Sequence, residues 1–212
     1  MATLDTDAQG LERALTRAVT NPNGFAPNPS LAEDCVRYLL RCVGEDPTRE
    51  GLVDTPRRWC KALAEMTSGR MVEPDAVLST VFNERYDEMV LVRNIRYTSM
   101  CEHHLLPFSG EMTVGYVPGE KVVGLSKIPR LVEVLSRRAS MQERVTREVA
   151  ETIARVLNPQ GVGVVARAHH SCMGCRGVRQ PDADMVTSSM LGCLRDGPAR
   201  AEFLGLAGLR TP

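Results

Sequence analysis

The residues best suited to chemistry are the histidines, because each of them stands close to a cysteine. The 212-residue sequence has four histidines in two adjacent pairs: His103 and His104 follow Cys101, and His169 and His170 precede Cys172. Thiolates and imidazoles brought together are the usual ligands of zinc. Ordinary burial of the thiols is the plain alternative, but it does not explain why all four histidines cluster with cysteines. The pattern predicts a metal site.

The second pair raises the question of which histidine lies beside Cys172. If residues 162–172 form a strand, side chains of equal parity share a face. His170 then points the same way as Cys172, and His169 points to the other face. We therefore expect His170, rather than His169, to be the neighbour of Cys172.

The first pair supplies the rest of the ligand set. Cys101 and His104 are three residues apart, so one turn of chain can bring both onto one ion. With Cys172 they form a three-ligand set that suits Zn²⁺ and leaves a fourth position open, as in catalytic zinc sites, where bound water has a pKa of about 7. His103 and His170 are then left beside the metal as proton carriers.

Two other zinc chemistries compete with this interpretation. Cys175 completes a C-x-x-C motif with Cys172, so a closed Cys3His shell of a structural zinc module is also possible. A nucleobase deaminase fits less well, because its H-x-E and P-C-x-x-C signatures are both absent.

Basic residues beside predicted helix starts are candidates for binding an anion. Ser126, Lys127 and Arg130 begin a helix after Gly124, where free backbone N–H groups and the helix dipole favour phosphate. An ordinary serine cap with two solvated basic residues is the alternative. Further cationic groups lie near the second cluster and on an earlier helix: Arg176, Arg58 and Lys61.

A carboxylate and an amide, Glu143 and Gln142, begin the fourth predicted helix. Ser140-x-x-Glu143 is a capping box, so Glu143 could serve only as a cap. A carboxylate beside an amide could equally bind the donor edge of a guanine-like base. The spacing alone leaves both interpretations open.

Composition narrows the class of protein. Lys plus Arg and Asp plus Glu number 26 each, which argues against a general nucleic-acid binder. No stretch approaches the roughly 20 apolar residues of a membrane span. Seven cysteines without an N-terminal export signal favour reduced thiols over a disulfide framework. We expect a cytoplasmic protein with no nucleic-acid or membrane partner.

Hydrophobic periodicity predicts the elements that must position these residues. Residues 1–29 form an appendage with one short amphipathic helix (Leu11, Ala14, Leu15 and Ala18), and the body is expected to be a single domain over 30–212. We predict helices that begin at a Ser30/Glu33 capping box, after Thr55 as N-cap with Pro56 as the first helical residue (ending at Gly69), at Ser126 and at Ser140. Strands are expected from about residue 89, around Met112, Val114 and Tyr116, over 161–172 and over 187–194. The order indicates an α+β domain with a mainly antiparallel sheet.

Taken together, the motifs resemble one known family. CEHHLLPFSG (101–110), GLSKIPRLVEVLSRR (124–138), QERVTREVAETI (142–153) and HSCMGCRGV (170–178) are similar to GTP cyclohydrolase I, and so is GEDPTREGLVDTPRR (44–58). The similarity covers about residues 30–206. It implies the tunnelling fold, an antiparallel sheet with two helices on one face in the order β-β-α-α-β-β, preceded by N-terminal helices. It also implies a homodecamer of two pentamers with active sites between subunits.

The resemblance further implies an activity and the residues that carry it. The family converts GTP to 7,8-dihydroneopterin triphosphate and formate, the entry step of folate and pterin biosynthesis. By position, Cys101, His104 and Cys172 match the zinc ligands and His103 and His170 the proton-transfer groups. Glu143 with Gln142 matches the purine anchor. The ribose-triphosphate contacts are matched by Ser126, Lys127, Arg130 and Arg176, with Arg58 and Lys61 from a neighbouring subunit.

Three positions depart from the family pattern: Cys175, the Trp59-Cys60 pair and His169. They leave the zinc chemistry in place. They keep a paralogue that opens the GTP ring and releases a different product as an alternative.

Overall fold

The computed structural model describes residues 28–84 and 86–208, which fall into two compact units. One unit ends at Met71 and the other begins at Val72. The helix predicted around Leu11 lies outside the described residues. In the described part of the chain, no helix is both long and apolar enough to cross a membrane.

The first unit is built from helices. Helix α2 spans Pro29–Cys42, α3 spans Thr55–Met66, and a 3-10 helix, η1, follows at Ser68–Met71. The predicted capping box at the first of these is wrong. Asn28 is the cap, because its side-chain oxygen accepts from the backbone N–H of Ser30 at 3.1 Å.

Both ends of the next helix also differ from the prediction. The helix begins at Thr55 after Asp54, so Asp54 rather than Thr55 is the N-cap residue, and Pro56 lies in the first turn as expected. The predicted end at Gly69 is too late, since α3 stops at Met66 and Gly69 belongs to η1.

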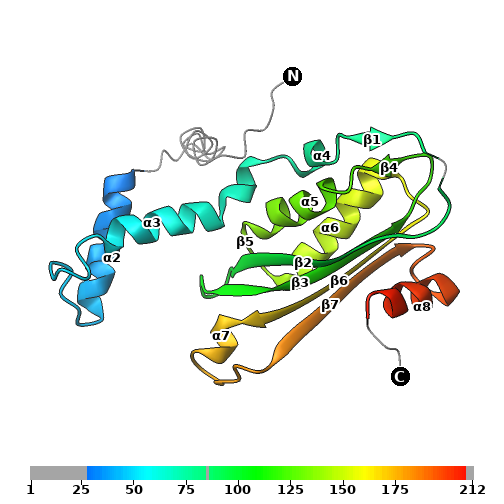
Figure 1. The fold of residues 1–212 in the computed structure, drawn as a ribbon. Coiled ribbons are helices and arrows are strands. Elements are labelled where there is room, and N and C mark those ends of the chain that lie inside the picture. Colours follow the sequence, from blue (N-terminus) through cyan, green and yellow to red (C-terminus); the bar gives the residue numbers. More distant parts are fainter. Residues whose placement is uncertain (1–27, 85, 209–212) are drawn as a thin grey trace. The chain divides into compact units, whose positions relative to one another are not determined.

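The second unit is an α+β fold with a mainly antiparallel sheet, as predicted. Its strands are β1 (Val81–Phe82), β2 (Val90–Cys101), β3 (Pro107–Val117), β4 (Val122–Val123), β5 (Ala139–Ser140), β6 (Gly161–His170) and β7 (Asp184–Gly192). Its helices are α4 (Pro74–Val77), α5 (Lys127–Ser136), α6 (Gln142–Leu157), α7 (Ser171–Gly174) and α8 (Gly197–Leu206). The main sheet has the order β5-β2-β3-β6-β7 and is antiparallel except for the short β2–β5 pair. The expected β-β-α-α-β-β order is confirmed by β2, β3, α5, α6, β6 and β7 (Figure 1).

One face of the sheet packs against α5 and α6, which lie side by side on it (Figure 1). The predicted alternation in β3 is confirmed, because Met112, Val114 and Tyr116 are all buried. The apolar faces of α5 and α6 pack against these strand residues in one core. The helix residues that are at most 2% exposed are Ile128, Leu131, Leu135, Val145, Val149 and Ile153. This shared core fixes the ends of β2 and β6 relative to α6.

Three predicted boundaries near the site need correction. Ser140 lies in β5 and Met141 is the N-cap residue of α6, without a side-chain cap bond, so the Ser140/Glu143 capping box does not form. The predicted strand over 161–172 ends at His170, and Cys172 lies in α7. The last strand covers Asp184–Gly192 rather than 187–194.

Helix α8 was not predicted, and it depends on two glycines. It packs with the fully buried ring of Phe203 against Gly115 of β3 and Gly163 of β6. A Cβ on Gly163 would stand 3.0 Å from two carbons of that ring. The glycines therefore leave the space that the aromatic ring fills.

We expect Gly163→Ala to lower the free energy of unfolding by about 1–3 kcal/mol, because the added methyl group overpacks the Phe203 contact. This exceeds the roughly 0.4–1 kcal/mol that alanine contributes by restricting the unfolded chain. The measurement is urea unfolding at fixed protein concentration. Gly205→Ala is the matched control, since its Cβ meets open space in α8. Equal stability of the Gly163→Ala variant and the parent chain would contradict the packing of Phe203 described above.

Candidate metal centre and the groups around it

Three side chains from two distant segments converge at one end of the sheet. Cys101 ends β2, His104 lies in the turn that follows, and Cys172 lies in α7, directly after β6. Their ligand atoms all lie within 4.8 Å of one another. The structure thus brings together the three residues that the sequence nominated as zinc ligands.

The β2–β3 turn has the shape needed to fold His104 back onto Cys101. The backbone N–H of Leu105 donates to the carbonyl of Cys101 at 2.8 Å, and the N–H of Cys101 donates to Leu106 at 2.9 Å. Leu105 adopts a φ of 51°, in the left-handed region that closes such turns. As a result, Nδ1 of His104 lies 3.8 Å from Sγ of Cys101.

An ion pair between Glu102 and Arg144 connects this turn to α6. Arg144 donates two hydrogen bonds to the Glu102 carboxylate, one of them at 3.1 Å between Nη2 and Oε1. This hydrogen bonding lowers the pKa of Glu102. The backbone N–H of Glu102 also donates to the carbonyl of Ser140, at 3.0 Å. The turn is therefore held through both its backbone and a side chain.

The single turn of α7 sets the position of Cys172. This helix directly follows β6. The backbone N–H of Cys175 donates a hydrogen bond to the carbonyl oxygen of Ser171, at 2.9 Å, which closes the turn. Burial raises the pKa of the half-buried Cys172 thiol, and the nearby Cys101 raises it further. Two sulfurs and one imidazole are the donors that zinc prefers, and a cation would favour the thiolates that burial disfavours. The residues therefore fit a zinc ion.

Cys175 stands apart from this group. It is exposed and does not belong to the cluster formed by Cys101, His104 and Cys172. The closed Cys3His shell would need it in that cluster. The arrangement of the described residues accordingly favours three protein ligands with one position open.

His103 stands beside the cluster on the solvent side. Its side chain is exposed, and Nδ1 lies 3.9 Å from Sγ of Cys101. Its ring meets that of His104 edge to face, with centroids 6.4 Å apart. It is thus within reach of a molecule bound at the cluster.

His170 is held on two sides. Its ring stacks on Phe108 with centroids 4.5 Å apart and planes 3° apart. Its Nε2 lies 2.9 Å from Oε1 of Gln142. Burial lowers the pKa of His170, while the charge of Glu143 opposes that shift. His170 is half-buried, whereas its neighbour His169 is exposed.

The remaining predicted site residues divide by location. Glu143 is exposed at the start of α6, near enough to His170 to affect it electrostatically. Arg176 reaches the cluster directly, with Nη1 3.0 Å from Nε2 of His104. Gln142 is fully buried, and its amide is bonded within the subunit. Arg58 and Lys61 are exposed on α3, where Arg58 pairs with Asp54.

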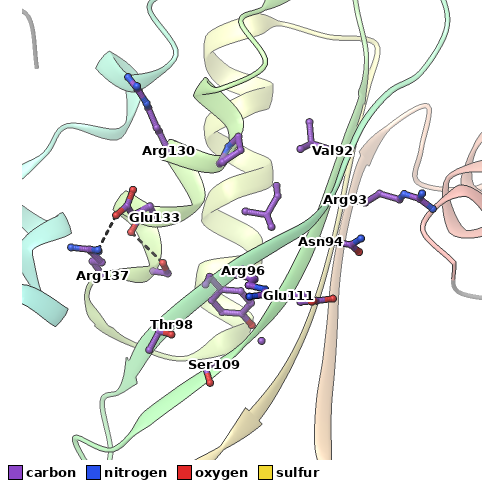
Figure 2. A pocket seen from close by; sticks show the side chains of 15 residues that line it. Val92, Arg93, Asn94, Arg96, Thr98, Ser109, Glu111, Arg130, Glu133 and Arg137 are labelled. Carbon is purple, nitrogen blue, oxygen red and sulfur yellow. Dashed lines mark hydrogen bonds and ion pairs between the residues drawn. The ribbon is translucent and has the colours of Figure 1, made fainter. Parts of the chain in front are cut away.

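The third group of predicted residues lies at the start of α5. Ser126 and Arg130 are exposed and Lys127 is half-buried. Arg130 lines a cavity of about 920 Å³ formed by α5, β2 and β3. Figure 2 shows this cavity, with the Glu133–Arg137 ion pair on its helix side and Arg96 and Glu111 on its strand side. Tyr97 also lines this cavity. Its hydroxyl is buried with no hydrogen-bond partner among the described residues, and burial raises its pKa.

The cavity adjoins an open edge of the sheet. Over the described residues, β2 has one partner on that side, β5, which pairs only with Met100 and Cys101. The opposite edge, β7, likewise has no further strand in the described part of the chain. Unpaired strand edges can pair with strands of another chain.

Sequence reasoning missed the groups that position the histidines. The Phe108–His170 stack depends on their being register partners in β3 and β6. The Glu102–Arg144 pair joins residues 42 positions apart. No local pattern signals either contact, since both arise from tertiary packing.

Comparison with known proteins gives one consistent result. The family described as GTP cyclohydrolase I matches residues 32–208. The chain is 49% identical to GTP cyclohydrolase 1 of Synechococcus sp. over 203 residues, which cover 92% of this chain and 89% of that protein. It is also 49% identical to GTP cyclohydrolase 1 of Bacillus subtilis over 179 residues, 84% of this chain and 94% of the relative. With GTP cyclohydrolase 1 of Mycobacteroides abscessus it shares 48% identity over 189 residues, 88% and 93% of the two chains.

Proposed function

Because the chain belongs to the GTP cyclohydrolase I family, we propose that it converts GTP to 7,8-dihydroneopterin triphosphate and formate, the first step of folate and pterin biosynthesis. The observation that carries this is the cluster of Cys101, His104 and Cys172, with His103 3.9 Å from Cys101 and His170 two residues before Cys172. A structural metal module has no use for two additional histidines at its metal.

The ion proposed for the cluster is Zn²⁺, held by Cys101, His104 and Cys172. When bound, zinc supplies a water nucleophile at neutral pH by lowering the pKa of that water to about 7. Reduced thiols are needed for this ligand set, which agrees with a place in the cytoplasm. None of the seven cysteines forms a disulfide. Four of them lie in the second unit, and the other three, Cys35, Cys42 and Cys60, lie in the first.

The protein groups proposed for proton transfer are His103 and His170. Opening the guanine imidazole ring breaks C–N bonds, and each leaving nitrogen must receive a proton. His103 is exposed beside Cys101, and His170 is held against Phe108 on the neighbouring strand. Imidazoles suit this role because their pKa lies near neutral pH. The exposed Glu143 carboxylate is proposed to accept hydrogen bonds from the guanine N–H groups.

The triphosphate is proposed to bind cationic groups from more than one subunit. Arg176 lies at the metal cluster, whereas Ser126, Lys127 and Arg130 lie at the start of α5 and make no hydrogen bond to the cluster within residues 28–84 and 86–208. The free edges of β2 and β7 support assembly by strand pairing between copies. Such pairing lays a second copy against the cavity that contains Arg130 (Figure 2). We propose a decamer of two pentamers, with Arg58 and Lys61 supplied by a neighbouring subunit.

The test is one incubation of purified, zinc-loaded protein with GTP, following formate and pterin together. We expect equal amounts of both. Formate without pterin would replace the proposal with a paralogue that releases a ring-opened product. Neither product, from folded protein that contains zinc, would replace it with a structural zinc domain.

A further inference from the structure

The side-chain amide of Gln142 has a fixed orientation. Its nitrogen lies 3.1 Å from the carbonyl oxygen of Ala166 and 2.9 Å from that of Met185. Carbonyl oxygens only accept hydrogen bonds, so the NH₂ group must face them. The amide oxygen therefore faces His170, and the residue is fully buried in this arrangement.

A closed set of hydroxyls supports the same orientation. The amide nitrogen also lies 3.2 Å from Oγ1 of Thr187, which lies 2.7 Å from Oγ1 of Thr146. Thr146 in turn donates to the backbone carbonyl of Gln142, at 2.7 Å. Because Thr146 uses its proton there, Thr187 donates to Thr146 and accepts from the Gln142 amide. Three acceptors thus share the two N–H groups of Gln142, and no donor remains for a purine base.

The fixed amide determines which nitrogen of His170 carries a proton. Oε1 of Gln142 only accepts, and Nε2 of His170 lies 2.9 Å from it. Nε2 must therefore be protonated. In the neutral ring, the lone pair then lies on Nδ1. Stacking on Phe108 holds the ring plane, so the imidazole is fixed in both tautomer and orientation.

We propose that Gln142 is a positioning residue that holds His170 in the Nε2–H tautomer, so that the lone pair available to the reaction lies on Nδ1. The catalytic part of this inference rests on the proposed function, whereas the tautomer does not. It assigns the Gln142 side chain to His170 in place of the purine contact expected from the sequence. A buried amide behind a catalytic imidazole resembles the way a carboxylate fixes the tautomer in a catalytic triad.

The tautomer can be read directly from nitrogen NMR of zinc-loaded protein labelled with ¹⁵N-histidine. The chain has only four histidines, and comparison with His170→Asn assigns the His170 signals. We expect a protonated Nε2 and an unprotonated Nδ1 in the parent protein and a mixture of tautomers in Gln142→Leu. Thr187→Val, which leaves both carbonyl acceptors in place, should keep the parental tautomer. A protonated Nδ1 in the neutral ring of the parent protein would overturn the inference, even if Gln142→Leu did not fold.

Kinetics separate positioning from substrate contact. For Gln142→Leu we expect kcat for formate release to fall by about 10- to 100-fold, within the range that acid–base catalysis contributes, while KM for GTP changes by less than about twofold. In a His170→Ala background the same substitution should have no further effect, since its target is gone. A rise in KM that persists in that background would mean that Gln142 contacts the base. If the parent protein released no formate, the proposed function would fail and the histidine spectrum would still decide the tautomer.

Discussion

Cys172→Ser is expected to abolish both metal binding and turnover, and Cys175→Ser to leave both unchanged. The Cys172 sulfur is one of three ligand atoms within 4.8 Å of one another, whereas Cys175 is exposed outside that cluster. A serine hydroxyl stays protonated at neutral pH and is a poor zinc ligand. Removing a residue that hydrogen-bonds to a metal ligand typically lowers metal affinity by roughly 10- to 100-fold. Removing the ligand itself should lower the affinity by more.

The measurement is metal content per chain by elemental analysis, with circular dichroism to report folding and formate release to report activity. The two variants are matched, because each replaces one cysteine sulfur by oxygen and the two positions are only three residues apart. Loss of zinc and fold in Cys175→Ser would establish the closed Cys3His site. Retention of zinc at about one ion per chain in Cys172→Ser would show that the ligand assignment is wrong.

The second large effect concerns the two histidines beside the cluster. His103→Ala and His170→Ala should each lower kcat by about 10²- to 10⁴-fold, the range typical for loss of a general acid or base. Zinc should remain at about one ion per chain, because neither imidazole belongs to the three-residue ligand set. The readouts are formate release at saturating GTP and metal content.

His169→Ala is the control for this pair. His169 adjoins His170 on β6 but is exposed, and by the alternation of a strand it lies on the opposite face of the sheet from His170. We expect its kcat to stay within about twofold of the parent, as for most surface substitutions. A parallel fall of zinc and activity in His103→Ala or His170→Ala would identify that histidine as a ligand.

The sequence predicted the chemistry of the site better than the details of its support. Cys101, His104 and Cys172 could be nominated because ligand types and short spacings are local properties. The parity argument for His170 over His169 stays a prediction, and its premise of a strand through residue 172 was wrong, since β6 ends at His170. One turn of helix, α7, instead returns Cys172 to the end of the sheet.

What the sequence could not predict depended on contacts between distant segments. Asn28 accepts the capping hydrogen bonds in place of the expected Ser30, since neighbouring polar residues compete for this role, and α3 begins one residue earlier than expected, after Asp54, which makes no side-chain cap bond. Helix α8 has little amphipathic pattern, and its position depends on Phe203 reaching two glycines on other strands. The buried Gln142 amide could be recognised as a partner of His170 only after the ends of α6, β6 and β7 were placed together.

The separation of the ligands along the chain has a consequence for how this protein matures. Cys101 and His104 precede β3, and Cys172 follows β6, about 70 residues later. One ion held by both segments would act as a cross-link that closes this long loop. By the loop-closure relation used for disulfides, such a link removes about 4 kcal/mol of chain entropy from the unfolded state. Loading of such an ion would thereby be coupled to completion of the central β3–β6 pairing, and the supply of the ion would add to the protein's resistance to unfolding.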